Sequence, residues 1–175
     1  MKAARVADHL ARKDVSFALI GGFAVIARGR PRFTRDYDFA TVDTQVLQRQ
    51  FWLDLGDASV DIRRADFDDP LRGVVRIVLS DATRVDVVVL KFQWQHRVIE
   101  RAEILDLGGI ALPVPRTSDV ILLKLFAAGG IDRTDVYELL HLPDREAIVA
   151  EVNEHIVELP EDAQQLWRTI LATEG

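Results

Sequence analysis

The chain has 175 residues, a formal net charge of −6, 49% apolar residues and 29% charged ones. This length and composition predict one compact domain, or a domain with a helical appendage, and exclude a disordered chain. Cysteine is absent, which excludes disulfides, thiolate metal sites and cysteine nucleophiles. The acid excess argues against binding nucleic acid by bulk charge alone, but it permits a local basic patch. No apolar run reaches the roughly 20 residues of a membrane span. The first residues lack a signal-peptide core, so we expect a cytoplasmic protein.

The first third of the chain alternates between helix and strand. Apolar residues at helical spacing predict a helix over residues 3–13, and the apolar run Val15–Ile20 is typical of a buried strand. Gly21-Gly22 then forms a turn that lets another backbone or a phosphate come close. The next expected elements are a short helix, a strand and an amphipathic helix: Phe23–Arg28, Asp36–Val42 and Thr44–Leu55.

The middle of the chain is typical of an antiparallel sheet, and the end is helical. The expected middle strands are short and β-branched: Val60–Arg64, Gly73–Leu79 and Arg84–Leu90. A helix over Phe92–Ala102 and an extended segment over Ile110–Val114 follow. Every later element is predicted to be a helix, over Ser118–Ala128, Thr134–Leu142, Arg145–Leu159 and Glu161–Ala172.

This order of elements predicts an α+β fold with a mixed or antiparallel sheet flanked by helices and a helical C-terminal part. The segment between Pro113 and Ser118 is the best candidate boundary. We therefore expect a sheet core over residues 1–114 and a C-terminal helical region over residues 115–175 that packs on it.

Two carboxylates stand out first. Asp36 and Asp38 are two residues apart on an expected strand, so both side chains project from the same face. A hard cation relieves the repulsion between such charges, and magnesium often needs only one or two carboxylates plus substrate phosphates. The alternative is a solvated strand face, although aspartate is disfavoured in strands. On these residues alone, the two interpretations are evenly balanced.

A third carboxylate, Asp86, interrupts an apolar strand in which Val85 and Val87 face the opposite side. Taken alone, it is best explained as the exposed face of an antiparallel strand. If this strand lies beside the strand of Asp36 and Asp38, three carboxylates converge. That arrangement is what a two-cation phosphoryl-transfer site needs.

Further charged residues could bind phosphate. Lys124 has apolar helical neighbours, so it must either extend to solvent, which is the usual outcome, or find a partner or a phosphate. Asp135, on the next helix, could hold Lys124 or contact substrate, or it could simply be an acid near a helix N-terminus. The loop before Asp36 is either solvated or able to hold phosphates or a nucleic-acid end. Its arginines are Arg28, Arg30, Arg32 and Arg35.

In this order, the residues resemble the signature of the DNA polymerase β-like nucleotidyltransferase superfamily. The resemblance rests on a strand, the Gly21-Gly22 turn, a short helix and then the pattern Arg-x-Thr-x-Asp-x-Asp over residues 32–38. The strand with Asp86 matches the third carboxylate of that superfamily. Lys124 and Asp135 are similar to motifs of abortive-infection (AbiEii-type) toxin nucleotidyltransferases.

Three positions depart from the pattern. Gly22 stands where many relatives have a serine whose hydroxyl touches phosphate. Thr134 stands where the later motif often has a lysine, and Glu138 stands where it has a second aspartate.

The resemblance implies a nucleotidyltransferase-like fold and a magnesium-dependent transfer of a nucleoside monophosphate from an NTP such as ATP to a hydroxyl. The implied metal ligands and catalytic residues are Asp36, Asp38 and Asp86, with Asp86 as the base. The implied nucleotide-binding residues are Gly21, Gly22, Arg35, Lys124 and Asp135. The acceptor would be an RNA, such as a tRNA 3′ end, or a protein, and a toxin of this kind would have a cognate antitoxin. The alternatives are a non-catalytic nucleotide-binding or partner-binding module of the same fold and, least favoured, a structural protein.

Overall fold

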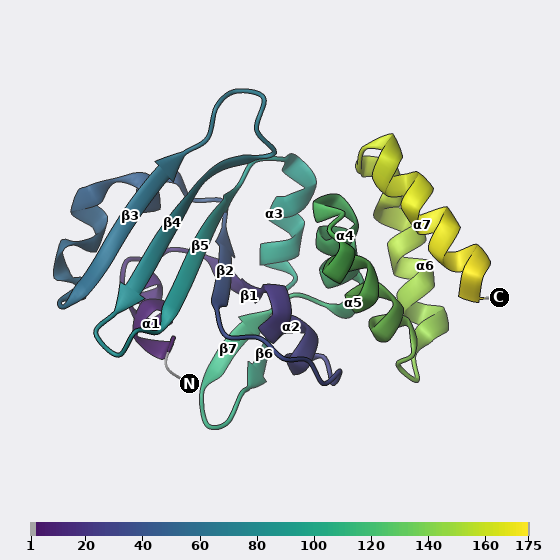
Figure 1. Cartoon of the computed structure of the whole chain (residues 1–175), viewed down its shortest axis with the longest axis horizontal. Coiled ribbons are helices and arrows are strands. Elements are labelled where there is room, and N and C mark those ends of the chain that lie inside the picture. The colour runs from purple at the N-terminus through teal and green to yellow at the C-terminus, as the bar shows by residue number, and fades with distance from the viewer. Residues whose placement is uncertain (1–2, 175) are drawn as a thin grey trace.

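The computed structural model describes residues 3–174. Met1, Lys2 and Gly175 lie outside the described residues. The first two belong to the predicted sheet core over residues 1–114, and Gly175 belongs to the predicted helical region over residues 115–175. The main sheet consists of β1 (Phe17–Ile20), β2 (Tyr37–Thr41), β3 (Ala58–Arg64), β4 (Leu71–Leu79) and β5 (Arg84–Leu90). Its strand order is β1-β2-β5-β4-β3, as Figure 1 shows. Only the β2–β5 pair in this sheet is parallel. The expected α+β fold with a mixed sheet is confirmed.

In the view of Figure 1, helices lie behind the sheet and to its right, and no helix of the described residues covers the front of β3, β4 and β5. The α-helices are α1 (Ala4–Arg12), α2 (Gly21–Ala27), α3 (Gln93–Glu100), α4 (Thr117–Ala127), α5 (Gly130–Leu140), α6 (Arg145–His155) and α7 (Glu161–Glu174). A separate antiparallel pair consists of β6 (Glu103–Asp106) and β7 (Ala111–Val114). Among residues 3–174, no helix is long and apolar enough to cross a membrane.

Strand β5 shows how the sheet separates the core from the candidate site. Val85, Val87 and Val89 are fully buried and face the main core. Asp86 and Val88 point to the opposite face, because side chains alternate along a strand. At one end of that second face, Ile99 of α3 packs on a small apolar cluster. Asp86 therefore lies on the side of the sheet away from the main core.

The helix expected over residues 44–55 differs in the structure. Residues 44–55 form two short 3₁₀ helices, η1 (Thr44–Leu47) and η2 (Arg49–Leu55), and not one helix. The backbone of Gln48 between them is extended, with φ −99° and ψ 128°. Asp43 accepts the backbone N–H of Gln45 at 2.8 Å, so it caps η1 as a separate turn. The apolar spacing of this segment was therefore right, but its helical type was wrong.

Strand β6, which pairs with the expected extended segment, was not predicted. Its residues are mostly exposed, so they lack the apolar alternation that marks a strand. Helix α5 also begins earlier than expected, at Gly130, because Ala128, the residue after α4, is in a left-handed conformation with φ 54° that stops α4.

The sheet and the C-terminal helices share one hydrophobic core, which includes buried residues from Ala3 to Ile170. Residues 136–175 contain nine acidic and two basic side chains. Several of these acids pair with arginines from the earlier part of the chain: Arg30 with Glu138, Arg97 with Glu158, and Arg101 with Glu151. Opposite charges thus accompany apolar packing where the two parts meet, and the boundary at residue 114 stays a prediction.

Candidate active site

One register row across all five strands carries two of the three candidate catalytic residues. Asp38 of β2 lies opposite Ile20 of β1 on one side and Asp86 of β5 on the other. Arg76 of β4 lies opposite Asp86, and Asp61 of β3 lies opposite Arg76. Residues paired in one row project from the same face of a sheet. The parallel pairing of β2 with β5 therefore places Asp38 and Asp86 side by side.

Folding raises the pKa of the Asp38 carboxyl. Burial, followed by the negative charge of Asp86, raises the pKa of Asp38 from 3.8 to about 6. Asp36 raises this pKa as well, whereas Lys124 and Arg32 lower it. Asp36, Asp86 and two cations thus all act on the Asp38 carboxylate. Its ionised form is destabilised by burial and by the two neighbouring negative charges.

The two glycines let α2 begin directly against this centre. Gly21 has φ +65°, a left-handed conformation that favours glycine, and a Cβ there would overlap the Asp38 carboxylate. A Cβ on Gly22 would lie 2.8 Å from Arg32 Nη1 and 2.9 Å from Thr34 Oγ1. The space that a serine would need at position 22 is therefore occupied by these two side chains. The helix starts at Gly21 itself, two residues earlier than expected.

Lys124 is buried and does not extend to solvent. Its Nζ lies 2.6 Å from Asp132 Oδ1 and 2.8 Å from Asp135 Oδ2. Arg32 Nη1 donates to the same Asp135 oxygen at 2.9 Å. Buried charges persist when they are paired in this way. The cluster of Lys124, Asp132, Asp135 and Arg32 thus joins α4 and α5 to the loop before β2.

Asp132 is a partner that the sequence analysis missed. It also accepts the backbone N–H of Gly129 at 3.2 Å, so it caps α5 at the same time. The signal was an acid three residues after a glycine at a helix start, a spacing typical of an N-terminal cap. It was overlooked because α5 was expected to begin later.

Asp36 and Arg35 lie further out than Asp38, in the exposed loop that leads into β2. They line a pocket of about 440 Å³ at the first residues of β2 and β5. The Arg35 guanidinium lies 5.3 Å from the ring centroid of Phe33. The roles of Asp36 in metal binding and of Arg35 in nucleotide binding stay predictions.

Asp86 is held by Arg76, whose Nε and Nη2 donate to its two oxygens at 3.2 Å each. In residues 3–174, no group of three or more His, Asp or Glu side chains is arranged to surround one metal ion. The convergence of Asp36, Asp38 and Asp86 on one cation therefore stays a prediction. The donors nevertheless fit magnesium, since neighbouring carboxylates on Asp38 and Asp86 repel each other and magnesium is often bound by one or two carboxylates plus phosphates.

Residues 1–172 match a family model described as "Nucleotidyl transferase of unknown function (DUF2204)". No curated protein matches the sequence. Among solved structures, an antigenic nucleotidyltransferase-like protein from Paracoccidioides brasiliensis is similar, with 16% identity and a TM-score of 0.51 over 96% of this chain and 84% of that one.

Two antibiotic-modifying enzymes also share the fold. The lincosamide antibiotic adenylyltransferase LnuA, with lincomycin bound, has 17% identity and a TM-score of 0.50 over 78% of this chain and 92% of its own. ANT(2″)-Ia, in complex with adenylyl-2″-tobramycin, has 13% identity and a TM-score of 0.51 over 98% of this chain and 96% of its own. At these identities the likeness concerns the fold, and the nucleotidyltransferase-like fold implied by the sequence is confirmed.

Proposed function

This chain belongs to the nucleotidyl transferase family of unknown function DUF2204, and we propose that it transfers a nucleoside monophosphate from an NTP to an acceptor hydroxyl in a magnesium-dependent reaction. The observation that carries the proposal is the register row in which Asp38 and Asp86 are direct neighbours. The two neighbouring carboxylates would bind a cation. Lys124, which is close enough to lower the pKa of Asp38, would bind the polyphosphate that accompanies the cation.

Each residue of the site would have a distinct task. Asp38 and Asp86 would hold the magnesium ion, with Asp36 beside them. When bound, magnesium supplies Lewis-acid polarisation of the phosphates and offsets their negative charge. Lys124 would bind the phosphates, kept in place by Asp135. The backbone at Gly21 would let the phosphates come close.

In the reaction, the acceptor oxygen would form a bond to the α-phosphorus of the NTP while the bond from that phosphorus to pyrophosphate breaks. Asp86 would accept the hydroxyl proton, since it lies at the side of the site away from Gly21. Lys124 would stabilise the charge that develops on the leaving pyrophosphate. The protein residues thus position the reactants, accept a proton and neutralise charge.

The proposed acceptor is a hydroxyl of an RNA, such as a tRNA 3′ end, or of a protein. A toxin role with a cognate antitoxin, and a cytoplasmic location, belong to the same proposal. The similar antibiotic enzymes make small antibiotics a further acceptor class to test. The competing proposal is a non-catalytic module that binds NTP, and the presence of all three aspartates favours catalysis over it.

The test is incubation with each α-³²P-labelled NTP, magnesium and total tRNA, total protein or an antibiotic. We expect label transfer and pyrophosphate release that Asp38→Asn reduces by at least about 100-fold, as loss of an electrostatic catalytic group does. Asp8→Asn, on the exposed side of α1, is the matched control and should retain activity. NTP binding without pyrophosphate release for any acceptor would instead support the non-catalytic module.

A further inference from the structure

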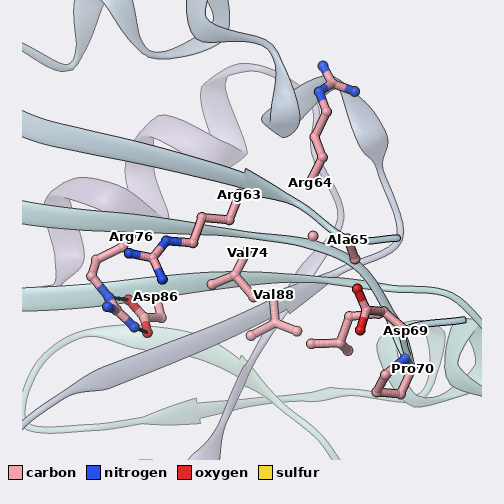
Figure 2. Close-up of a pocket in the computed structure, with 11 residues that line it drawn as sticks. Arg63, Arg64, Ala65, Asp69, Pro70, Val74, Arg76, Asp86 and Val88 are labelled. Atoms are coloured by element: carbon pink, nitrogen blue, oxygen red, sulfur yellow. Dashed lines mark hydrogen bonds and ion pairs between the residues drawn. The ribbon is translucent and has the colours of Figure 1, made fainter. Parts of the chain in front are cut away.

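The sheet face that carries Asp86 continues into a pocket of about 460 Å³. Val74 of β4 and Val88 of β5 lie side by side along it (Figure 2). Arg76 and Asp86 are at one end of the pocket, and the loop 65–70 between β3 and β4 is at the other. A pocket of this volume is in the range of small-ligand sites.

The position of this pocket relative to the carboxylates indicates what it holds. Gly21 lies against Asp38 on the β1 side of the register row, and Lys124 lowers the pKa of Asp38. Asp86 stands on the other side of Asp38 and lines the pocket. A general base must be within hydrogen-bond reach of the proton that it accepts. A hydroxyl within reach of Asp86 would therefore belong to a molecule in this pocket.

We propose that this pocket binds the acceptor, and that the acceptor is the 3′-terminal nucleotide of a single-stranded RNA. The inference rests on the proposed function and narrows it, because that function leaves RNA and protein acceptors open. Charge, the apolar floor and an exposed aromatic ring each support it.

The charges that line the pocket favour an anionic acceptor. Of its two carboxylates, Asp86 is paired with Arg76, and Asp69 Oδ2 accepts the backbone N–H of Asp66 at 2.6 Å. The Arg63 side chain is 72% exposed and that of its ion-pair partner Asp61 is exposed as well, so the pair constrains Arg63 weakly. Arginine matches phosphate with two parallel hydrogen bonds.

Arg64 also lines the pocket, but its guanidinium turns away from the end with Asp86 (Figure 2). Its Nη2 donates to the Leu47 carbonyl at 2.9 Å, which holds the side chain at one orientation. A polycationic acceptor would meet the guanidinium groups of Arg63 and Arg76 in this pocket. A protein hydroxyl would bring no phosphate to pair with them.

The floor and the loop fit a nucleotide base. Val74 and Val88 offer an apolar surface on which a flat ring can pack. Phe67, in the loop 65–70, is 91% exposed, and Lys91 Nζ lies 5.3 Å from its ring centroid. Lys91 also donates to the Asp69 carbonyl at 2.9 Å, which connects the loop to the residue that follows β5. Aromatic rings beside cations are the usual surface for single-stranded nucleic acid.

The chemical step balances without any further reactant. The 3′ oxygen of the RNA forms a bond to the α-phosphorus of the NTP, and the bond from that phosphorus to pyrophosphate breaks. The hydroxyl proton passes to Asp86. The products are an RNA one nucleotide longer and pyrophosphate.

The first test measures RNA binding without catalysis. The probe is a 5′-fluorescein single-stranded RNA of twelve nucleotides, and the readout is fluorescence anisotropy in EDTA without NTP. We expect Arg63→Glu to weaken binding by about tenfold and Phe67→Ala by at least about fivefold, as expected for a phosphate contact and a stacked base. Arg168→Glu, on the exposed face of α7, is the matched control and should bind as the wild type does. Equal affinity of wild type and Arg63→Glu, or no binding, would overturn the proposal.

The second test separates failure of this inference from failure of the proposed function. Label transfer is compared for the same RNA with a free 3′ hydroxyl and with a 3′ phosphate, for total protein, and for a polycationic aminoglycoside. Transfer only to the free hydroxyl, with Arg63→Ala raising KM for RNA and leaving KM for NTP unchanged, supports the inference. Transfer only to protein or to the aminoglycoside overturns it and leaves the proposed function standing. If no acceptor releases pyrophosphate, the proposed function fails, and the anisotropy result alone decides whether the pocket binds RNA.

Discussion

Arg76 and Asp86 face each other on neighbouring strands and form a two-pronged ion pair, with both hydrogen bonds at 3.2 Å. The hydrogen bond and charge of Asp86 raise the pKa of Arg76 above its usual value. The negative charge of Asp61, which lies opposite Arg76 on β3, raises this pKa further. Arg76 therefore neutralises the carboxylate beside Asp38, and a cation that binds Asp86 must compete with it.

Removal of that competitor should strengthen magnesium binding. We expect Arg76→Ala to bind magnesium up to about fivefold more tightly in the absence of NTP, which is the upper range for an exposed ion pair. Isothermal titration with MgCl₂ measures the change, and Arg168→Ala serves as the control. Unchanged or weaker magnesium affinity in Arg76→Ala would show that Asp86 does not contribute to the metal site.

Ionised Asp38 should destabilise the metal-free protein at neutral pH. Because the folded-state pKa is about 6 and the ordinary value is 3.8, the folded protein binds more protons between those values, and its stability falls as the pH rises through them. A shift of about two pKa units corresponds to about 3 kcal/mol. Asp38→Asn should therefore raise the free energy of unfolding by about 1–3 kcal/mol at pH 8 and by little at pH 4.

Urea denaturation in EDTA at pH 4, 6 and 8 checks this dependence. Asp8→Asn, which alters an exposed carboxylate, should show no comparable gain at pH 8. If the free energy of unfolding of Asp38→Asn differs from that of the wild type by the same amount at all three pH values, ionisation of Asp38 is not what destabilises the protein.

Magnesium should offset the destabilisation caused by ionised Asp38. A cation bound to ionised Asp38 stabilises the folded state by linkage, and protonation of Asp38 opposes that binding. We expect 10 mM MgCl₂ to raise the Tm of the wild-type protein more at pH 8 than at pH 5. The rise at pH 8 should be largely absent in Asp38→Asn. Differential scanning fluorimetry measures both, and an equal rise in the variant would contradict the assignment of Asp38 as a ligand.

The Lys124 cluster should support both stability and nucleotide binding. Lys124→Met removes the cation that the half-buried Asp132 and the buried Asp135 share and leaves Asp135 with Arg32 alone. Loss of one partner from a buried pair costs about 3–5 kcal/mol, and the remaining Arg32 should place this variant at the lower end of that range. Adding Asp135→Asn should recover part of that loss, because a neutral amide needs no cation. Affinity for NTP, measured by titration calorimetry, should stay low in the double variant. Recovery of NTP affinity together with stability would show that Lys124 has only a structural role.

The local signals in the sequence were reliable where neighbouring residues decide the structure. The β-branched runs formed β3, β4 and β5, and Gly21-Gly22 marked the transition from strand to helix. The segment 44–55 and the strand β6 were missed or misassigned. Their conformations depend on a cap at Asp43 and on pairing with β7, neither of which apolar periodicity reveals.

The sequence by itself determined which side chains could do chemistry. These are the carboxylates of Asp36, Asp38 and Asp86, and the amine of Lys124, whose helical neighbours are apolar. Only the tertiary structure decided which of them meet. Strand β2 pairs with β5, which is distant in the chain, so Asp38 and Asp86 become neighbours and the pKa of Asp38 rises. The packing of α4 against α5 joins Lys124 to Asp132 and Asp135, and the β4–β5 pair brings Arg76 to Asp86. Charges act over short distances in space, and folding alone sets those distances.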